Sequence, residues 1–320
     1  MIKVFIGGTI SFLLASFLYP HFIKFLQENN FQQKPSEYAL EEYKEKSKTV
    51  TFGGFIFLIV PIIVTVFLLN RYLDRNTVLI LLVFLGYGLI GLVDDYKIVK
   101  EGKNDGLSAK MKFALQLILA VVFYVLYLKF GGDNLLTVPF KKTPIDLSYL
   151  YFVMVLFILT GSSNAVNLTD GMDGLASGTV IIALLPFAYF AYQQAEMGLF
   201  FFVISLIASL FAFLRFNKSP AKIFMGDVGS LALGAVLGVL SILLRKELLF
   251  VIIGGVFVFE TVTVIMQQIS WRTRRKRIFK YTPIHYSFTL NGWKEKDVVL
   301  LFYALGLTFA LIGLGLSALS

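Results

Sequence analysis

Carboxylates recur at three places in the chain, each at the edge of a long apolar run. Asp94 and Asp95 lie in GLVDDYK, Asp170 and Asp173 in NLTDGMDG, and Asp227 in FMGDVGS. Clustered carboxylates, with two histidines and no cysteine in the chain, favour a hard cation such as Mg²⁺ over Zn²⁺. Mg²⁺ and nearby lysines suit phosphoryl transfer, which depends on positioning and charge neutralisation. These segments are therefore candidates for a phosphate-processing site.

Each segment also has a simpler interpretation. Adjacent residues on a helix point about 100° apart, so Asp94 and Asp95 could serve two functions, on a metal and as a base, or simply mark the end of a span. Asp-Gly is ordinary turn chemistry, which explains one such pair better than two flanked by Asn164 and Asn167. Asp227 could merely cap the apolar helix that follows it.

Other polar and aromatic residues extend this set. Phe224, three residues before Asp227, is either a stacking platform for a base or an interfacial anchor. His285, in the basic loop sequence TPIHYSF, is a better site candidate than His21, which lies in an apolar run near a proline. Glu260 is an acid within an apolar run, and it is either functional or part of a buried polar contact. Five lysines are available to neutralise phosphate, although membrane topology also explains them: Lys46, Lys97, Lys100, Lys110 and Lys112.

Composition defines the class of protein that must position these residues. Of the 320 residues, 57% are hydrophobic and only 15% are charged, against roughly 25% charged in soluble domains. Apolar runs long enough to cross a bilayer recur along the chain, which predicts an all-α, polytopic membrane protein forming one domain, 1–320. About ten spans are expected: 4–26, 52–69, 77–93, 111–130, 148–163, 175–193, 197–216, 229–245, 247–270 and 297–318.

Basic residues predict the orientation. Most of the 29 lysines and arginines fall in alternate loops, at 34–48, 97–112, 215–222 and 272–296. The positive-inside rule makes these loops cytoplasmic and places both termini outside. All the polar segments then lie on the cytoplasmic side, which predicts a single site there. The net charge of +9 suits anionic lipid or a polyphosphate substrate, and nothing resembles a nucleic-acid-binding module, so no nucleic-acid partner is expected.

Taken in order, the motifs resemble those of a known family. GLVDDYK, NAVNLTDGMDGLASG, FMGDVGSLALG and PIHYSFTLNGWKEKDVV are similar to segments of the phospho-N-acetylmuramoyl-pentapeptide transferases, the MraY family. The resemblance runs from about Lys46 to Val299. It implies an Mg²⁺-dependent enzyme of the bacterial inner membrane, and the family suggests a homodimer. At the cytoplasmic leaflet such an enzyme transfers phospho-MurNAc-pentapeptide from UDP-MurNAc-pentapeptide to undecaprenyl phosphate, giving lipid I and UMP.

The resemblance also implies roles for individual residues. Asp94 matches the base that deprotonates the lipid phosphate and Asp227 a ligand of Mg²⁺, with Asp95 as a further catalytic and metal candidate. His285 is a fourth catalytic candidate. The expected substrate-binding residues are Lys46, Lys110, Asn164, Asn167, Asp170, Asp173, Asn217, Phe224 (on uracil) and Gln267. Direct attack and a covalent aspartyl intermediate both remain open.

The sequence departs from the family pattern at three places. KTVTFGG replaces the usual GTPTMGG, Ile98 stands where a lysine is expected, and HYSFT replaces a histidine triplet followed by FE. These departures leave open a related transferase that uses another UDP-N-acetylhexosamine. A second alternative is a cation- or proton-coupled transporter, which predicts paired broken helices and acids near the membrane midplane. Apart from Glu260, the acids lie at span ends instead.

Overall fold

The structure is a computed structural model that describes residues 2–32, 49–68, 73–101, 106–141 and 143–319. Within these ranges the chain is almost entirely helical. The helices are α1 (Ile2–Glu28), α3 (Gly54–Leu68), α4 (Arg75–Glu101), α5 (Ala109–Lys129), α6 (Tyr149–Thr169), α7 (Leu175–Gln193), α8 (Met197–Asn217), α9 (Gly226–Leu243), α10 (Glu247–Ile253), α11 (Gly255–Arg274), α12 (His285–Thr289) and α13 (Glu295–Ala318). Between α5 and α6, β1 (Leu135–Leu136) pairs antiparallel with β2 (Ile145–Asp146).

Helices lie at all ten predicted spans, and the all-α membrane fold is confirmed. Among the described residues, eight helices are long and apolar enough to cross a membrane, and α10 with α11 supplies a ninth segment. Two predicted spans differ in form. The span at 52–69 is the 15-residue helix α3, about 22 Å long at 1.5 Å per residue, which is short of a bilayer core of about 30 Å. The span at 247–270 is two helices bent by 80°, with Gly254 and Gly255 at the break, where the missing Cβ atoms ease a sharp turn.

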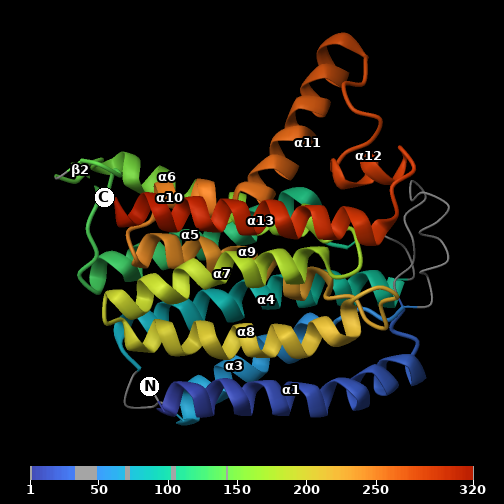
Figure 1. Cartoon of the computed structure of the whole chain (residues 1–320), viewed down its shortest axis with the longest axis horizontal. Coiled ribbons are helices and arrows are strands. Elements are labelled where there is room, and N and C mark those ends of the chain that lie inside the picture. Colours follow the sequence, from blue (N-terminus) through green and yellow to red (C-terminus); the bar gives the residue numbers. More distant parts are fainter. Residues whose placement is uncertain (1, 33–48, 69–72, 102–105, 142, 320) are drawn as a thin grey trace.

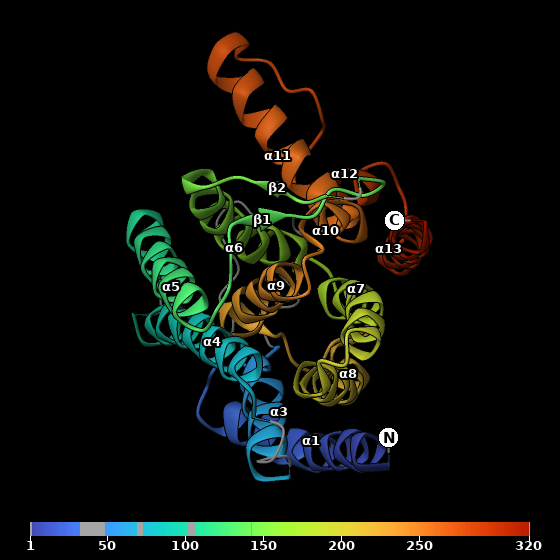
Figure 2. The ribbon, with the colours of Figure 1, turned by 90° about the vertical axis from the view of Figure 1, so that its left-hand side faces the viewer.

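Helix α9 forms the centre of the bundle. Figure 2 shows it surrounded by α4, α6, α7 and α8, and every residue from Val228 to Leu243 is buried. Its glycines allow neighbouring helices to approach closely, as small residues do in membrane proteins generally. A Cβ on Gly234, for example, would lie 2.3 Å from the backbone oxygen of Ser162 on α6. The carboxylate at the start of α9 therefore lies at the edge of a tightly packed core.

The contact between α4 and α9 brings two of the aspartate motifs together. A Cβ on Gly91 would lie only 2.1 Å from the carbonyl oxygen of Asp227, so α4 reaches the start of α9 only because residue 91 is glycine. Asp94 and Asp95 follow three and four residues later, which places both near the face of α4 that carries Gly91.

The polar segments converge at one end of the bundle. Figure 1 shows the two termini at the left end, together with the β1–β2 hairpin. The end of α4, the α6–α7 and α8–α9 connections and α12 lie at the opposite end (Figure 1). The segments that were predicted to share one face therefore lie at a common end of the helices.

Helix α11 slants away from the other helices (Figures 1 and 2). Its apolar side chains include Val262, Ile265 and Ile269, which are between 44% and 57% exposed. Exposed apolar surface of this kind suits contact with lipid.

Candidate active site

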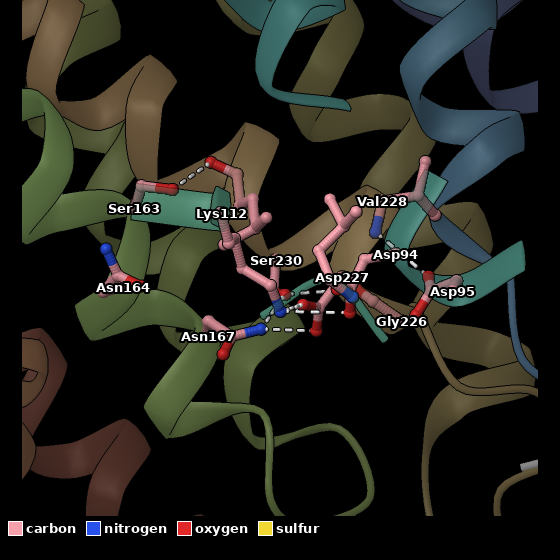
Figure 3. A network of polar contacts seen from close by, with 12 residues as sticks. Asp94, Asp95, Lys112, Ser163, Asn164, Asn167, Gly226, Asp227, Val228 and Ser230 are labelled. Carbon is pink, nitrogen blue, oxygen red and sulfur yellow. Dashed lines mark hydrogen bonds and ion pairs between the residues drawn. The ribbon is translucent and has the colours of Figure 1, made fainter. Parts of the chain in front are cut away.

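Three aspartates form an acidic cluster where α4 meets α9. Oxygen atoms of Asp94, Asp95 and Asp227 lie within 4.8 Å of one another, the first two side chains being buried and the third half-buried (Figure 3). Carboxylates this close repel one another strongly in a medium of low dielectric. The cluster therefore requires a positive charge or protons to be stable.

Lys112, on α5, supplies a positive charge to this cluster. Its ammonium nitrogen lies 3.0 Å from Oδ2 of Asp94 and 2.5 Å from Oδ2 of Asp227, so it bridges the ends of α4 and α9 (Figure 3). The second oxygen of Asp94 accepts a hydrogen bond from the backbone N–H of Leu107 at 2.7 Å. Both oxygens of Asp94 are thus occupied in this state of the protein.

The structure brings Lys112 to the aspartates rather than Lys110, the lysine that the resemblance favours. Lys110 is exposed, and residues two apart on a helix point roughly 200° apart. The sequence does carry a signal for Lys112. It lies four residues before Gln116, which together with Ala120 and Phe123 forms the buried face of α5.

Backbone groups at the start of α9 hold Asp95, the other member of the Asp94–Asp95 pair. Oδ2 of Asp95 accepts a hydrogen bond of 3.1 Å from the N–H of Val228, in the first turn of α9. First-turn N–H groups have no partner within their helix, and the helix dipole favours a negative charge there. A Cβ on Gly226, which has φ +69°, would lie 2.3 Å from the same oxygen. Glycine is therefore required both for the turn and for access of Asp95.

Asn167 orients the third aspartate. Its Nδ2 donates to Oδ1 of Asp227 at 2.7 Å and to the hydroxyl of Ser230 at 2.9 Å (Figure 3). Asn164, one turn earlier on α6, donates instead to Oε1 of Gln116 at 2.7 Å. Of these two predicted residues, Asn167 touches the acidic cluster, whereas Asn164 contacts the lysine-bearing face of α5.

The Asp-Gly segment comprises residues 170–174. Its second half, Asp173 and Gly174, is fixed by neighbouring elements. The hydroxyl of Tyr303 donates to the carbonyl of Gly174 at 2.6 Å, and Glu295 accepts from the N–H of Asp173 at 2.8 Å. Oδ2 of Asp173 accepts from the N–H of Ala221 at 2.9 Å and so holds the connection between α8 and α9. This oxygen of Asp173 therefore stabilises the fold.

Asp170 differs from Asp173. It is half-buried at the end of α6, and no described residue donates a hydrogen bond to its carboxyl group. Burial, followed by the nearby charges of Asp227 and Asp173, raises the pKa of Asp170 to about 8. The carboxyl group is therefore largely protonated at neutral pH and can donate a hydrogen bond to a ligand.

The other predicted binding residues are dispersed. Asn217 is buried, accepts from Ser177 at 2.9 Å and donates to the carbonyl of Ile223 at 3.0 Å, which fixes the loop that carries Phe224. Phe224 is half-buried, and its backbone pairs with that of residues 50 and 53. Lys46 lies outside the described residues.

Gln267 is engaged with the protein backbone. Its Oε1 accepts from the N–H groups of Ile278 and Phe279, at 2.9 and 3.1 Å, and its Nε2 donates to the carbonyl of Phe279. It also lines a pocket of about 260 Å³ between α11 and the following loop, together with Trp271 and Arg277 among others. The structure shows no contact of Gln267 with the acidic cluster.

His285 begins α12 and is completely buried. Its Nδ1 lies 2.9 Å from Oε1 of Glu260, which is also completely buried. A Cβ on Gly171 would lie 2.2 Å from Nε2 of His285, so the imidazole packs against the Asp-Gly segment. The imidazole thus lies beneath the segment that carries Asp170.

The acidic cluster fits a divalent cation. It offers three carboxylates within a small volume, and hard cations such as Mg²⁺ are commonly held by one or two carboxylates plus substrate phosphates. The ammonium of Lys112, placed between two of the three carboxylates, shows that the cluster already accommodates a cationic group.

The fold and the site together define a class of protein. A helical membrane bundle that gathers carboxylates, a bridging lysine and carboxamides at one end is organised as an integral membrane enzyme for phosphate chemistry. The comparisons with known proteins are specific. Residues 77–245 match the model of glycosyl transferase family 4.

Relatives cover nearly the whole chain. The phospho-N-acetylmuramoyl-pentapeptide transferase of Bacillus subtilis is 43% identical over 307 residues, 95% of each chain. The protein of the same name from Geobacillus kaustophilus is 41% identical over 313 residues, 97% of each chain. The chain therefore belongs to glycosyl transferase family 4, and within it to the phospho-N-acetylmuramoyl-pentapeptide transferases.

Proposed function

We propose that this enzyme transfers phospho-MurNAc-pentapeptide from UDP-MurNAc-pentapeptide to undecaprenyl phosphate, releasing UMP and forming lipid I for peptidoglycan synthesis. The observation that carries the proposal is the buried cluster of Asp94, Asp95 and Asp227, bridged by Lys112 at one end of the bundle. The names of relatives at 41–43% identity support the muramoyl donor.

By direct attack, the reaction is one phosphoryl transfer. An oxygen of the lipid phosphate attacks the phosphorus that is joined to the sugar, and the bond from that phosphorus to the oxygen of UMP breaks. Any proton on the attacking phosphate passes to a carboxylate, for which Asp94 is our candidate. Its oxygens are held by Leu107 and Lys112, so the carboxylate is oriented before substrate binds. Movement of the Lys112 ammonium onto a phosphate would free Asp94 to accept the proton.

We assign the metal site to Asp227, with Asp94 and Asp95 as further ligands. Mg²⁺ there would neutralise the phosphate oxygens of the donor as charge develops on the leaving UMP. The carboxamide of Asn167 fixes the rotamer of Asp227, and the first turn of α9 fixes that of Asp95. These contacts keep the oxygen donors in place without requiring a bound ion.

The donor nucleotide would lie beside the Asp-Gly segment. Protonated Asp170 offers a hydrogen-bond donor to a ligand rich in acceptors, and the half-buried ring of Phe224 offers a surface for the uracil base. Lys46, Lys110, Asn164, Asp173, Asn217 and Gln267 remain proposed contributors to substrate binding. For Asp173, Asn217 and Gln267 the observed contacts support an indirect contribution, through the loops that they hold.

A second donor is supported by one observation. Tyr286 follows His285 where the family has another histidine, and its hydroxyl donates to the carbonyl of Gly171 at 3.1 Å. This substitution lies directly at the Asp-Gly segment. A related UDP-N-acetylhexosamine is therefore the alternative donor.

We further propose that the site faces the cytoplasm from the bacterial inner membrane, with both termini on the outer side. The basic loops at 97–112, 215–222 and 272–296 support this orientation. A homodimer remains an expectation drawn from the family.

Release of UMP from two donors tests the proposal. Purified protein is given Mg²⁺ and undecaprenyl phosphate with either UDP-MurNAc-pentapeptide or UDP-GlcNAc. We expect UMP from the muramoyl donor only, and loss of that signal in Asp227→Asn. UMP from UDP-GlcNAc alone would assign the enzyme to the alternative donor. Absence of UMP with both donors, from folded protein, would refute the transferase activity.

A further inference from the structure

Glu260, on α11, and His285, at the start of α12, form a buried polar pair beside the Asp-Gly segment. Both side chains are 0% exposed. Oε1 of Glu260 lies 2.9 Å from Nδ1 of His285, and Oε2 accepts from the backbone N–H of Ile284 at 2.9 Å. Both oxygens of the glutamate are therefore engaged at the start of α12. Burying such a pair is costly unless its hydrogen bonds are well formed.

The other nitrogen of the imidazole is directed at Gly171. Nε2 is buried and has no hydrogen-bond partner among the described residues. A Cβ on Gly171 would lie 2.2 Å from this nitrogen and 2.7 Å from the hydroxyl oxygen of Tyr286. Only glycine at this position lets the segment pack against the imidazole. The hydroxyl of Tyr286 donates a hydrogen bond to the carbonyl of the same glycine.

The hydrogen-bond geometry favours one tautomer of His285. Because Glu260 is an acceptor, Nδ1 carries a proton and donates it to the carboxylate. The neutral form with Nδ1–H leaves only a lone pair unpaired at Nε2, whereas a proton at Nε2 would leave a buried donor unpaired, at a cost of about 1–3 kcal/mol. The observed geometry thus favours the tautomer with its proton on Nδ1, held by Glu260.

We propose that Glu260 and His285 are a positioning pair for the Asp-Gly segment, and that His285 does not touch the reacting atoms. Glu260 lies on α11 shortly after the Gly254–Gly255 bend, so the pair ties the direction of α11 to the segment that carries Asp170. Tyr286 contributes a second tie from α12. The inference depends on the proposed function only in assuming that this segment binds the nucleotide of the donor.

The protonation of His285 can be observed directly. The chain has two histidines, and His21 is exposed, with Nδ1 2.9 Å from the carbonyl of Phe17. In ¹⁵N-histidine NMR, we expect His285 to show a protonated Nδ1 and an unprotonated Nε2. Glu260→Gln should alter this signature and leave the His21 signal unchanged. A proton on Nε2 in the unliganded wild-type protein would contradict the fixed tautomer.

Nucleotide binding separates positioning from catalysis. In Glu260→Gln and His285→Gln we expect the Kd of UDP with Mg²⁺ to rise about tenfold, the size of effect of one lost buried hydrogen bond to a charged group. The double variant should be no weaker than the singles, because the two residues act as one unit. Gly171→Ala, which keeps the imidazole but displaces it, should weaken binding similarly. Independent, additive losses would contradict the pair.

A matched control and a rate profile complete the test. Glu247→Gln removes another buried carboxylate of the same bent helix pair, one that accepts from Tyr151 at 2.6 Å at the opposite end of the bundle. It should leave UDP affinity unchanged, and melting of each variant checks folding. Unchanged UDP affinity in His285→Gln, with a lost limb in the pH–rate profile, would make His285 catalytic and overturn the proposal. If the expected non-additive losses of UDP affinity are found but neither donor is turned over, the result would instead count against the proposed function alone.

Discussion

Lys112 is the side chain whose importance the structure changes most. Replacing it with alanine leaves Asp94 and Asp227 without their bridging cation, so we expect activity to fall by about 100-fold or more. Lys129→Ala removes a positive charge from the exposed, opposite end of α5 and should leave activity unchanged. Initial rates of UMP release compare the two variants. Equal losses would show that the positive charge of this helix matters only through the overall electrostatic field.

Asp170 should make nucleotide binding dependent on pH. With a pKa of about 8 it is protonated below that pH and ionised above it, so its capacity to donate a hydrogen bond is lost as pH rises. We expect UDP affinity, measured by calorimetry, to decrease through about pH 8. Asp170→Asn retains a donor and should abolish the transition. A transition unchanged in this variant would assign it to another group.

The same residue affects stability with a definite sign. Its folded-state pKa lies above the ordinary value of 3.8, so the folded protein retains a proton that the unfolded chain has lost. The contribution of Asp170 to stability therefore decreases from about pH 4 to pH 8 and is constant above that. Between about pH 4 and pH 8, the melting temperature of Asp170→Asn should therefore fall less with pH, or rise more, than that of the wild type. A difference of the opposite sign would contradict the assigned shift.

At the scale of single residues, the sequence predicted the aspartates and Asn167 but did not distinguish Lys112 from the other candidate lysines. Asp94, Asp95 and Asp227 were predictable as a group because all three lie at ends of predicted spans on the same side of the membrane. The bridge by Lys112 depends on the rotation of α5 about its axis, which is specified by the buried positions Gln116, Ala120 and Phe123 rather than by a motif. The burial of His285 depends on where α12 packs, and no local pattern specifies that.

At the scale of elements, the α4–α9 contact determines whether the cluster forms. Gly91→Ala would place a methyl group 2.1 Å from the carbonyl oxygen of Asp227 and force the helices apart. Overpacking of this kind costs about 1–3 kcal/mol, so we expect melting to fall by several degrees and activity to fall with it. Gly161→Ala, on α6, has nothing within 4 Å and should leave both unchanged. Wild-type melting of Gly91→Ala would contradict the close contact.

The elements themselves were largely predictable because apolar runs of bilayer length specify membrane helices. Two features were not. The described part of α3 begins at Gly54, two residues after the start of the predicted span, and hydropathy alone does not specify that start. The bend between α10 and α11 interrupts an apolar run that predicts one continuous span. Hydropathy contains no information on the direction of a helix axis, so it does not predict the bend.

At the scale of the whole molecule, the two ends of the bundle should face opposite compartments. The chain contains no cysteine, so single cysteines can be introduced without removing native ones. Lys222→Cys, exposed at the aspartate end, should resist a membrane-impermeant thiol reagent in intact cells. Asp146→Cys, exposed on the β1–β2 hairpin, should react. The reverse pattern would invert the proposed orientation.

The central claim is that transfer takes place at the Asp94–Asp95–Asp227 cluster. The most direct measurement is formation of the lipid-linked phospho-muramoyl product in proteoliposomes containing Mg²⁺, for each aspartate changed singly to asparagine. We expect each of the three variants to lose about 100-fold or more of the wild-type rate. Asp133→Asn, which removes a carboxylate paired with Arg245 at the opposite end, should keep that rate. Near-wild-type transfer by folded Asp94, Asp95 and Asp227 variants would place the reaction elsewhere in the protein.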